Sequence, residues 1–377
     1  MKIFIYSNIV VNDFGLGITK KVLAQIKAVK KLGYTVYYTG YTDDGVAVFD
    51  NNENIVAFNK YPFKNPKIRH AIRRNMLLLL ATQFIKSSNI KFDTAYLRHH
   101  YFDATYLKLL RTLKKINAKI IVEAHSYPNY NWSIKLLVSP RLPVYVLDFL
   151  YAKKVHKYID LIAAMSSHKR IWSVPALQIE NTVYLDEMKP KNPQKENNII
   201  TLIAVAYEAL THGYDRIVNG LYQYYSNGGK REIIVNFVGR PTVSTVQLVK
   251  RLGMEERYVF NGIKINDDLD YMYDISDIAI GHLGNHRIGS YSGSSIKVVE
   301  YLAKGIPFIY AWRELRIDDS FPYALKFELC DEPIDFIKVV EFYDDMQKVN
   351  NLVEKMRGYA SDMSNWEEQF KKVFDAV

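Results

Sequence analysis

The sequence predicts an α/β protein with two doubly wound domains, each a parallel sheet covered by helices. Three observations support this prediction: strands and helices alternate along both halves, the alternation restarts after a polar segment at 188–198, and 377 residues exceed one ordinary core. A hydrophobic content of 49% is enough for full cores and excludes a disordered chain. We expect an N-terminal domain over 1–190 and a C-terminal domain over 191–355.

In the first half, a strand is expected at 2–6, followed by a loop and a helix over 18–32 that Gly33 stops. Further strands are expected at the apolar runs 35–38, 94–97, 119–123 and 161–164. Strands that alternate with helices in this way usually pair in parallel and are covered on both faces.

The second half repeats the pattern. Strands are expected at 199–204, 233–238, 258–260, 278–280 and 308–311. Helices are expected at 214–225, 243–252, 269–275 and within 333–377. Two such halves form a cleft, and ligands of doubly wound sheets bind at the carboxyl ends of the strands.

Composition narrows the possible environments. We find no signal peptide, since the first residues already read as a strand, and no run of about 18 uncharged apolar residues. Cys330 is the single cysteine, which excludes an internal disulfide and a cysteine-built metal site. We therefore expect a cytoplasmic protein.

The net charge of +10 is unevenly distributed. Residues 1–190 contain 28 Lys and Arg against 13 Asp and Glu, whereas residues 191–377 contain 22 against 27. This asymmetry indicates that the first half faces an anionic partner, either nucleic acid or a lipid surface.

The most informative motif is a turn–helix–turn unit at 294–307. Two serines can cap the start of its helix, and Gly305 suits the left-handed residue that ends it. Lys297 and Glu300 are three residues apart, on adjoining parts of one helix face. Free amides, a cation and a carboxylate in this order suit a phosphate followed by ribose hydroxyls. On spacing alone, a solvated Lys/Glu pair explains them as well.

This segment resembles the nucleotide-sugar signature of family-4-type GT-B glycosyltransferases, in which a small-residue loop leads into a helix reading K-x-x-E-x-x-A-x-G-x-P. The resemblance implies that Glu300 holds the donor ribose. The positions that would hold the donor diphosphate are Ser294, Ser295, Ile296 and Lys297. The family's earlier glutamate is replaced here by Ser292, which leaves the contact with the sugar ring open.

Other positions resemble the family's cleft residues. Gly15 and Gly17 match its glycine-rich first loop, although a simple tight turn explains them equally well. His125 matches a histidine near the transferred sugar, where a protonated or donor imidazole could polarise the leaving phosphate; the alternative is a packed residue. The turns at Gly239 and Gly262–Ile263 match strand ends around the nucleotide, the second through backbone groups at the base.

The family commonly clamps the diphosphate with an arginine and a lysine, and Tyr207 and His212 stand at these positions here. A leaving diphosphate needs a cation close by. The candidates that could contact it are His212, Arg216, Arg287 and Lys297. His-Gly-Tyr-Asp-Arg followed by Leu-Gly-x-His-Arg resembles a subgroup of capsule and exopolysaccharide glycosyltransferases.

The resemblance implies a GT-B fold, with two Rossmann-like domains facing a cleft and a last segment, 356–377, that packs back on the first domain. It implies a hexosyltransferase-type, retaining enzyme that moves a sugar from a nucleotide diphosphate sugar to a growing, lipid-linked bacterial glycan. Retention by same-face attack needs no protein base, so no catalytic carboxylate is nominated. No metal is expected, since Asp267, Asp268 and Asp270 stand at a helix start that favours acids in any case.

Basic residues beside apolar runs indicate where the acceptor or a membrane would dock. Arg69, Arg73 and Arg74 precede a leucine run, and Trp132 begins an apolar, aromatic stretch. This pattern suits peripheral docking on the anionic inner face of a bacterial plasma membrane, whereas a core helix with a basic outer face is the alternative. No nucleic-acid-binding motif is found.

Two other functions remain open. A sugar-nucleotide epimerase has the same fold but acts on a free nucleotide sugar without an acceptor. A catalytically inactive partner subunit is the second alternative, because both family cations are replaced.

Overall fold

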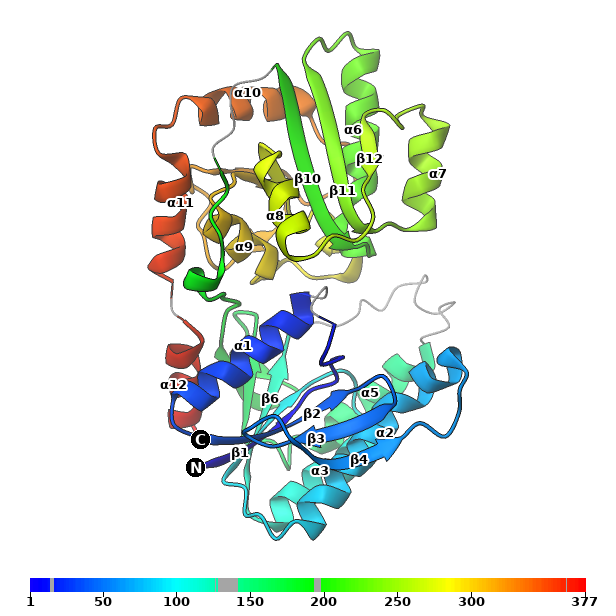
Figure 1. Ribbon diagram of the computed structural model, residues 1–377, viewed down its shortest axis with the longest axis vertical. Helices are drawn as coiled ribbons and strands as arrows, with labels where there is room; N and C mark the ends of the chain where they lie inside the picture. Colours follow the sequence, from blue (N-terminus) through cyan, green and yellow to red (C-terminus); the bar gives the residue numbers. More distant parts are fainter. Residues whose placement is uncertain (14–16, 126, 128–141, 193–197, 364) are drawn as a thin grey trace. The chain divides into compact units, whose positions relative to one another are not determined.

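The computed structural model describes residues 1–13, 17–125, 127, 142–192, 198–363 and 365–377. The chain forms two compact units. Unit 1 comprises residues 1–180 together with 365–377, and unit 2 comprises residues 181–364. Each unit is a sheet with helices on both faces (Figure 1).

The sheet of unit 1 has the strand order β4-β3-β2-β1-β5-β6-β7-β9-β8. Its parallel strands are β1 (Lys2–Tyr6), β2 (Thr35–Tyr41), β5 (Thr94–Arg98), β6 (Lys119–Ala124), β7 (Leu161–Ala164) and β9 (Val174–Gln178). At one edge, β3 (Gly45–Phe49) and β4 (Ile55–Lys60) add an antiparallel hairpin, and β8 (Arg170–Ile171) runs antiparallel to β9 at the other. The sequence analysis missed β3, β4, β8 and β9.

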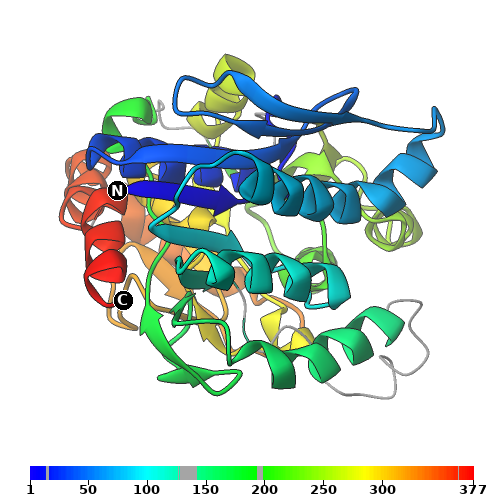
Figure 2. The same ribbon diagram turned by 90° about the horizontal axis from the view of Figure 1, so that it is seen from below.

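Helices cover both faces of this sheet. α1 (Gly17–Lys31) and α12 (Trp366–Asp375) pack together on one face, where Val22 and Phe370 share a core with the strand residue Ile5. The opposite face carries α2 (Pro66–Ser87), α3 (Ala104–Lys115) and α5 (Leu142–Val155), which lie side by side in Figure 2. The end of the chain is therefore part of unit 1.

The sheet of unit 2 is parallel throughout its described strands, in the order β12-β11-β10-β13-β15-β17. These strands are β10 (Ile199–Tyr207), β11 (Glu232–Arg240), β12 (Tyr258–Phe260), β13 (Ile278–Ile280), β15 (Phe308–Tyr310) and β17 (Ala324–Lys326). All but β17 match an expected strand. β17 has the sequence Ala-Leu-Lys and is only partly buried, so no continuous apolar run marks it.

The helices of unit 2 divide between the two faces of its sheet. One face carries α6 (Tyr214–Ser226), α7 (Val243–Arg251) and α10 (Phe336–Gln347). The other carries α8 (Asn266–Asp274), α9 (Ile296–Lys304) and α11 (Leu352–Ser361). The connections change face between β10 and β13, so the topological switch point lies there, and its carboxyl edge is where such sheets bind ligands.

Candidate functional site

The loops after β10 and β13 meet at the switch point. β10 is followed by the short helix η2 (Leu210–His212) and by Gly213, whose φ is +63°. The amide of Leu283, after β13, donates to the carbonyl of His212 at 3.1 Å. A Cβ on Gly213 would lie 2.9 Å from the backbone of Gly284, so this close approach requires glycine.

Helix α9 begins at the same edge, and side chains fix the loop before it. Ser294 Oγ accepts the amide hydrogen of Asn181 at 2.8 Å. Ser295 occupies the N-cap position, but its buried Oγ makes no cap and has no partner among the described residues. Glu314 accepts the Ser295 amide instead, at 3.0 and 3.2 Å from its two oxygens. The expectation that the serines cap α9 is therefore wrong, because Asn181 and Glu314 hold this loop.

Lys297 lies in the first turn of α9 and is half-buried. Its Nζ donates to the hydroxyl of Tyr214, at the start of α6, at 3.0 Å. Burial lowers the pKa of Lys297 to about 7, against the attraction of Glu300 and Glu208. Within the part of the chain that the structure describes, no carboxylate lies within 4 Å of this ammonium. Lys297 is thus a cation that an anionic ligand can neutralise.

Two histidines stack beside Lys297. The rings of His212 and His282 lie 4.9 Å apart at 19°, and Tyr214 packs against His212 with centroids 5.2 Å apart. His212 Nδ1 lies 2.9 Å from the amide nitrogen of Ala209 and 3.3 Å from the carbonyl oxygen of the same residue. Burial and Lys297 lower the pKa of His212 strongly and that of His282 to about 3. Both imidazoles are neutral at pH 7, so His212 offers a hydrogen bond and not a charge.

The two candidate arginines are already engaged. Arg287 NH1 and NH2 each lie 2.8 Å from one oxygen of Asp215, and its Nε lies 2.7 Å from Asp331. Arg216 is 2% exposed and donates to three backbone carbonyl oxygens, those of Glu332, Leu283 and Glu328. Arg216 therefore connects these loops, and its engaged donors disfavour a role as a diphosphate ligand.

The remaining donor-site candidates lie at strand ends or on α9. The amide of Gly239 donates to the carbonyl of Gly262 at 2.7 Å, which joins the ends of β11 and β12. A Cβ on Gly239, whose φ is +130°, would lie 2.0 Å from the carbonyl oxygen of Ala206 on β10, so only glycine fits. Ile263 follows this turn and is 48% exposed. Glu300 is half-buried, one turn after Lys297.

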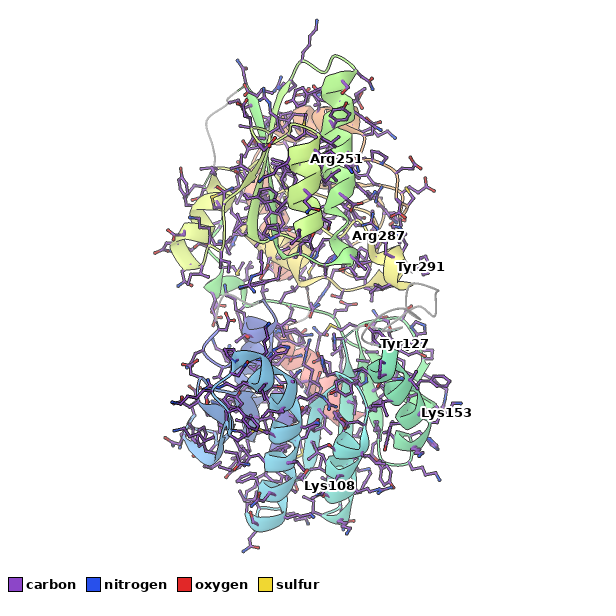
Figure 3. All side chains as sticks on the ribbon, turned by 90° about the vertical axis from the view of Figure 1, so that its right-hand side faces the viewer. Lys108, Tyr127, Lys153, Arg251, Arg287 and Tyr291 are labelled. Carbon is purple, nitrogen blue, oxygen red and sulfur yellow. The ribbon has the colours of Figure 1, made fainter. Side chains whose placement is uncertain are left out.

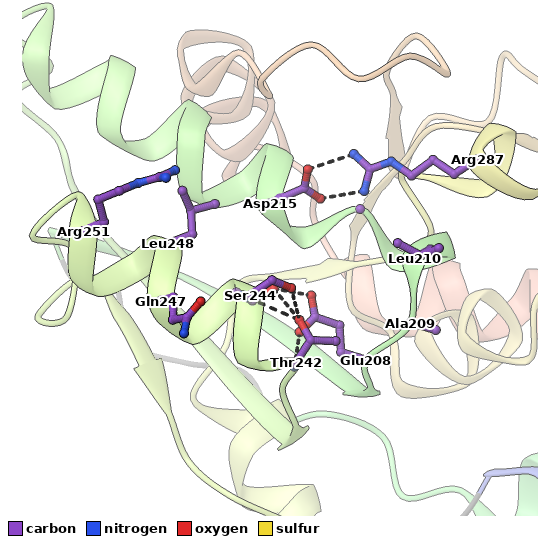
Figure 4. Close-up of a pocket in the computed structure, with 12 residues that line it drawn as sticks. Glu208, Ala209, Leu210, Asp215, Thr242, Ser244, Gln247, Leu248, Arg251 and Arg287 are labelled. Carbon is purple, nitrogen blue, oxygen red and sulfur yellow. Dashed lines mark hydrogen bonds and ion pairs between the residues drawn. The ribbon is translucent and has the colours of Figure 1, made fainter. Parts of the chain in front are cut away.

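A cavity of about 560 Å³ lies at the starts of α6 and α7 (Figure 4). Glu208 lines it and is held by the amide of Thr242 at 2.7 Å and the hydroxyl of Thr245 at 2.6 Å. The Arg287–Asp215 pair lines it as well, and Figure 3 shows Arg287 and Arg251 on this side of unit 2. The cavity opens on the α6 and α7 side of the sheet, whereas α9 lies on the other side.

In unit 1, His125 follows β6 directly and is half-buried. Burial and the neighbouring Arg98 lower its pKa well below the usual range, so the imidazole is neutral. Its Nδ1 is buried without a partner among the described residues. The lowered pKa disfavours the protonated form, and the role of His125 beside the transferred sugar stays a prediction. Gly17 begins α1, whereas Gly15 and Trp132 lie outside the described residues.

Sequence reasoning missed a buried polar cluster beneath His125. Glu123 on β6 is fully buried and accepts four hydrogen bonds, at 2.6 to 3.0 Å. The donors are Lys21, Gln25, Tyr96 and Arg98. Lys21 and Arg98 hold the pKa of Glu123 far below its usual range despite burial. A glutamate inside an apolar strand was the available signal, but its partners come from two other elements, α1 and β5.

The basic residues of α2 do not form one exposed face. Arg74 is 6% exposed, with NH1 2.6 Å from Asp103 and its guanidinium 3.6 Å from the ring centroid of Tyr101. It belongs to the interior of unit 1, which corrects its assignment to a docking face. Arg69 and Arg73 are half-buried and lie over tyrosine rings.

Exposed apolar side chains gather on α5 instead. We define the α5 patch as Val146, Leu147, Phe149, Leu150, Lys153 and Lys154. Lys153 Nζ lies 4.4 Å from the ring centroid of Phe149, and Figure 3 shows Lys153 at the outer side of the unit. No helix among the described residues is long and apolar enough to cross a membrane. No group of three acidic, histidine or cysteine residues in the described ranges is arranged to hold a metal ion.

Two units of this construction define the GT-B fold class, and comparison with solved structures confirms the predicted fold. A glycosyltransferase from Rickettsia africae ESF-5 is 15% identical, with a TM-score of 0.65 over 99% of this chain and 97% of that chain. WaaG, a glycosyltransferase involved in lipopolysaccharide biosynthesis, is 12% identical, with a TM-score of 0.65 over 100% of this chain and 99% of that chain. Anabaena HepE in complex with UDP-glucose is 12% identical, with a TM-score of 0.62 over 100% of both chains. No protein-family model matches the sequence, and no curated protein matches it.

Proposed function

We propose that this chain is a nucleotide-sugar-dependent glycosyltransferase of the hexosyltransferase type. The main observation behind the proposal is the arrangement at the start of α9, which lies at the carboxyl edge of the switch point. There, Lys297 has no carboxylate within 4 Å among the described residues. The fold supports it, because a structure with the same fold, HepE, is a complex with UDP-glucose. The donor diphosphate would lie on the α9 amides and Lys297, and the ribose on Glu300.

Sugar transfer from such a donor releases a diphosphate, and the protein must stabilise its negative charge. The Lys297 ammonium and the α9 amides would neutralise charge as the bond to the sugar breaks. His212, as a neutral imidazole, would add a hydrogen bond without charge. We propose retention through attack on the same face of the sugar, with no protein carboxylate as nucleophile and no metal ion.

We further propose that the acceptor is a growing, lipid-linked glycan of a bacterial capsule or exopolysaccharide, reached from the inner face of the plasma membrane. The α5 patch supports this, since it combines four exposed apolar side chains with two lysines. Apolar anchors and cations together favour an anionic leaflet over a neutral one.

The test begins with nucleotide binding. Thermal unfolding is followed with UDP, ADP, GDP and dTDP, because a ligand that binds only the folded state raises the melting temperature. The matching nucleotide sugar is then supplied with and without a membrane extract as the acceptor source. Acceptor-dependent release of the nucleoside diphosphate supports a transferase, and turnover of the sugar nucleotide without acceptor indicates an epimerase. A melting temperature that none of the four nucleotides raises would favour an inactive partner subunit.

A further inference from the structure

Lys297 depends on Tyr214 for its only hydrogen bond among the described residues. The Nζ–hydroxyl distance is 3.0 Å, and the ammonium lies 5.5 Å from the centroid of the same ring. Lys304, seven residues later on α9, is instead paired with Asp270. A half-buried ammonium whose one fixed partner is a neutral hydroxyl retains hydrogen-bonding capacity for a ligand, and no carboxylate within 4 Å among the described residues offsets its charge.

Tyr214 is held rigidly. Its side chain is fully buried, its ring meets that of Phe237 edge-on with centroids 5.7 Å apart at 81°, and His212 packs beside it. Gly213, immediately before it, is fixed by the contact between the β10 and β13 loops. The hydroxyl of Tyr214 has no other partner in the described ranges. The position of this oxygen is therefore set by the core of unit 2.

The charged groups around Lys297 do not replace this contact. Both oxygens of Glu208 are occupied by Thr242 and Thr245. Glu300 lies one turn further along α9 and forms no ion pair with Lys297 within 4 Å. His212 and His282 are neutral at pH 7.

We infer that Tyr214 is a positioning residue, which fixes the Lys297 ammonium at the start of α9 as a ligand for the diphosphate of the donor. This inference rests on the proposed function and deepens it. Tyr214 touches no substrate: it accepts a hydrogen from Lys297, and Lys297 donates its remaining hydrogens to phosphate oxygens. The hydrogen bond also favours the charged form of Lys297, because an ammonium donates more strongly than an amine.

The affinity for nucleoside diphosphates should therefore depend on pH. With its pKa near 7 in the free protein, Lys297 is charged below pH 7 and loses its proton above it. Nucleoside diphosphate affinity should therefore be highest below about pH 7 and fall as the pH rises through this value. Removal of the Tyr214 hydroxyl lowers the pKa of Lys297 further, which moves the fall in affinity to lower pH.

The experiment measures dissociation constants by calorimetry between pH 6 and pH 8.5. The probe is whichever of UDP, ADP, GDP and dTDP raises the melting temperature most. The variants are Tyr214→Phe, Lys297→Met and the double variant. Tyr258→Phe is the matched control, since Tyr258 is fully buried in the same core and its hydroxyl has no partner among the described residues.

Tyr214→Phe should weaken binding about tenfold at pH 7, the usual size for one hydrogen bond to a charged group. It should also shift the pH profile to lower pH. In the Lys297→Met background the same substitution should change affinity less than twofold, because the two residues act as one unit. Tyr258→Phe should leave affinity and profile unchanged.

If Tyr214→Phe lowers the affinity for the nucleotide equally in the wild-type and Lys297→Met backgrounds, the inference is overturned, because the tyrosine would then act through general packing. An unchanged pH profile in Tyr214→Phe would overturn it as well, while leaving the proposed function intact. If the wild-type protein binds none of the four nucleotides, the proposed function fails and the inference fails with it.

Discussion

Arg287 and Asp215 form a two-point ion pair, in which each terminal nitrogen of the guanidinium lies 2.8 Å from one carboxylate oxygen. Asp331 accepts a hydrogen bond from Nε, so two carboxylates pair with this one arginine. Lys297 has no carboxylate within 4 Å among the described residues. From the sequence both residues were candidates for the diphosphate cation, and this difference in pairing favours Lys297.

Lys297→Met should lower turnover by about two orders of magnitude, the usual cost of losing an electrostatic partner of the transition state. Arg287→Ala should lower turnover less than tenfold, because Arg287 is neutralised within the protein. Steady-state kinetics of the two variants with the same donor decides between them. A larger loss of turnover in Arg287→Ala than in Lys297→Met would show that a ligand draws Arg287 away from Asp215.

Glu300→Ala should weaken nucleotide-sugar binding by about 1–3 kcal/mol, the range for losing hydrogen bonds to a charged group. The carboxylate lies one turn after Lys297, where the ribose is expected if the diphosphate lies on the helix start. Calorimetry on the folded variant measures this change. Glu354→Ala, an exposed substitution on α11, is the control and should have no effect. Unchanged affinity in Glu300→Ala would remove this residue from the donor site.

Glu314→Gln should stabilise the protein increasingly as the pH rises from about 5 to 8. Burial raises the pKa of Glu314 in the folded state to about 8, whereas the unfolded value is near 4.5. Between these values the folded state binds more protons than the unfolded state, so wild-type stability falls as the pH rises, by at most about 1.4 kcal/mol per pH unit. Glutamine removes this dependence and can still accept the Ser295 amide hydrogen.

Urea unfolding of wild type and Glu314→Gln at pH 5, 6.5 and 8 measures the difference in unfolding free energy. Glu341→Gln, on the exposed side of α10, provides a control whose difference should stay constant with pH. A constant difference for Glu314→Gln would mean that Glu314 stays ionised in the folded protein throughout.

The sequence predicted the elements whose patterns are local. Strands β7, β12 and β13 were placed at their observed bounds, because a short apolar run between turn residues is sufficient. The hairpin of β3 and β4 was missed, since β4 is almost wholly exposed and shows no buried face.

Side-chain pairing could not be predicted in the same way. Glu123 binds Lys21, Arg74 binds Asp103 and Glu314 binds the Ser295 amide across 19 or more residues of chain, and only the fold brings these pairs together. The motif around α9 could be identified because its residues are consecutive. The roles of its serines could not, because these depend on Asn181 and Glu314.

Arg74→Gln should lower the free energy of unfolding by about 3 kcal/mol, because it leaves Asp103 without its partner in a mostly buried pair. Arg73→Gln, one residue earlier, should cost less than about 1 kcal/mol, since Arg73 is half-buried and contacts a tyrosine ring. Chemical unfolding of both variants gives the comparison. An equal decrease in the free energy of unfolding in both variants would contradict the interior role of Arg74.

The final prediction concerns the α5 patch. Replacement of Lys153 and Lys154 together by glutamine should weaken binding to anionic vesicles by about 2 kcal/mol, or roughly 30-fold, since each lysine near an anionic surface contributes about 1 kcal/mol. Binding of the wild-type protein should fall with added salt, because screening acts within about 10 Å at 0.1 M. Co-sedimentation with vesicles of neutral and anionic lipids measures both effects.

Lys371→Gln with Lys372→Gln on α12 is the matched control, with two exposed lysines removed from the same unit. If both double variants weaken binding equally, the attraction comes from the net charge of the unit. Retention on mixed-sequence DNA at the same salt would point to nucleic acid as the partner.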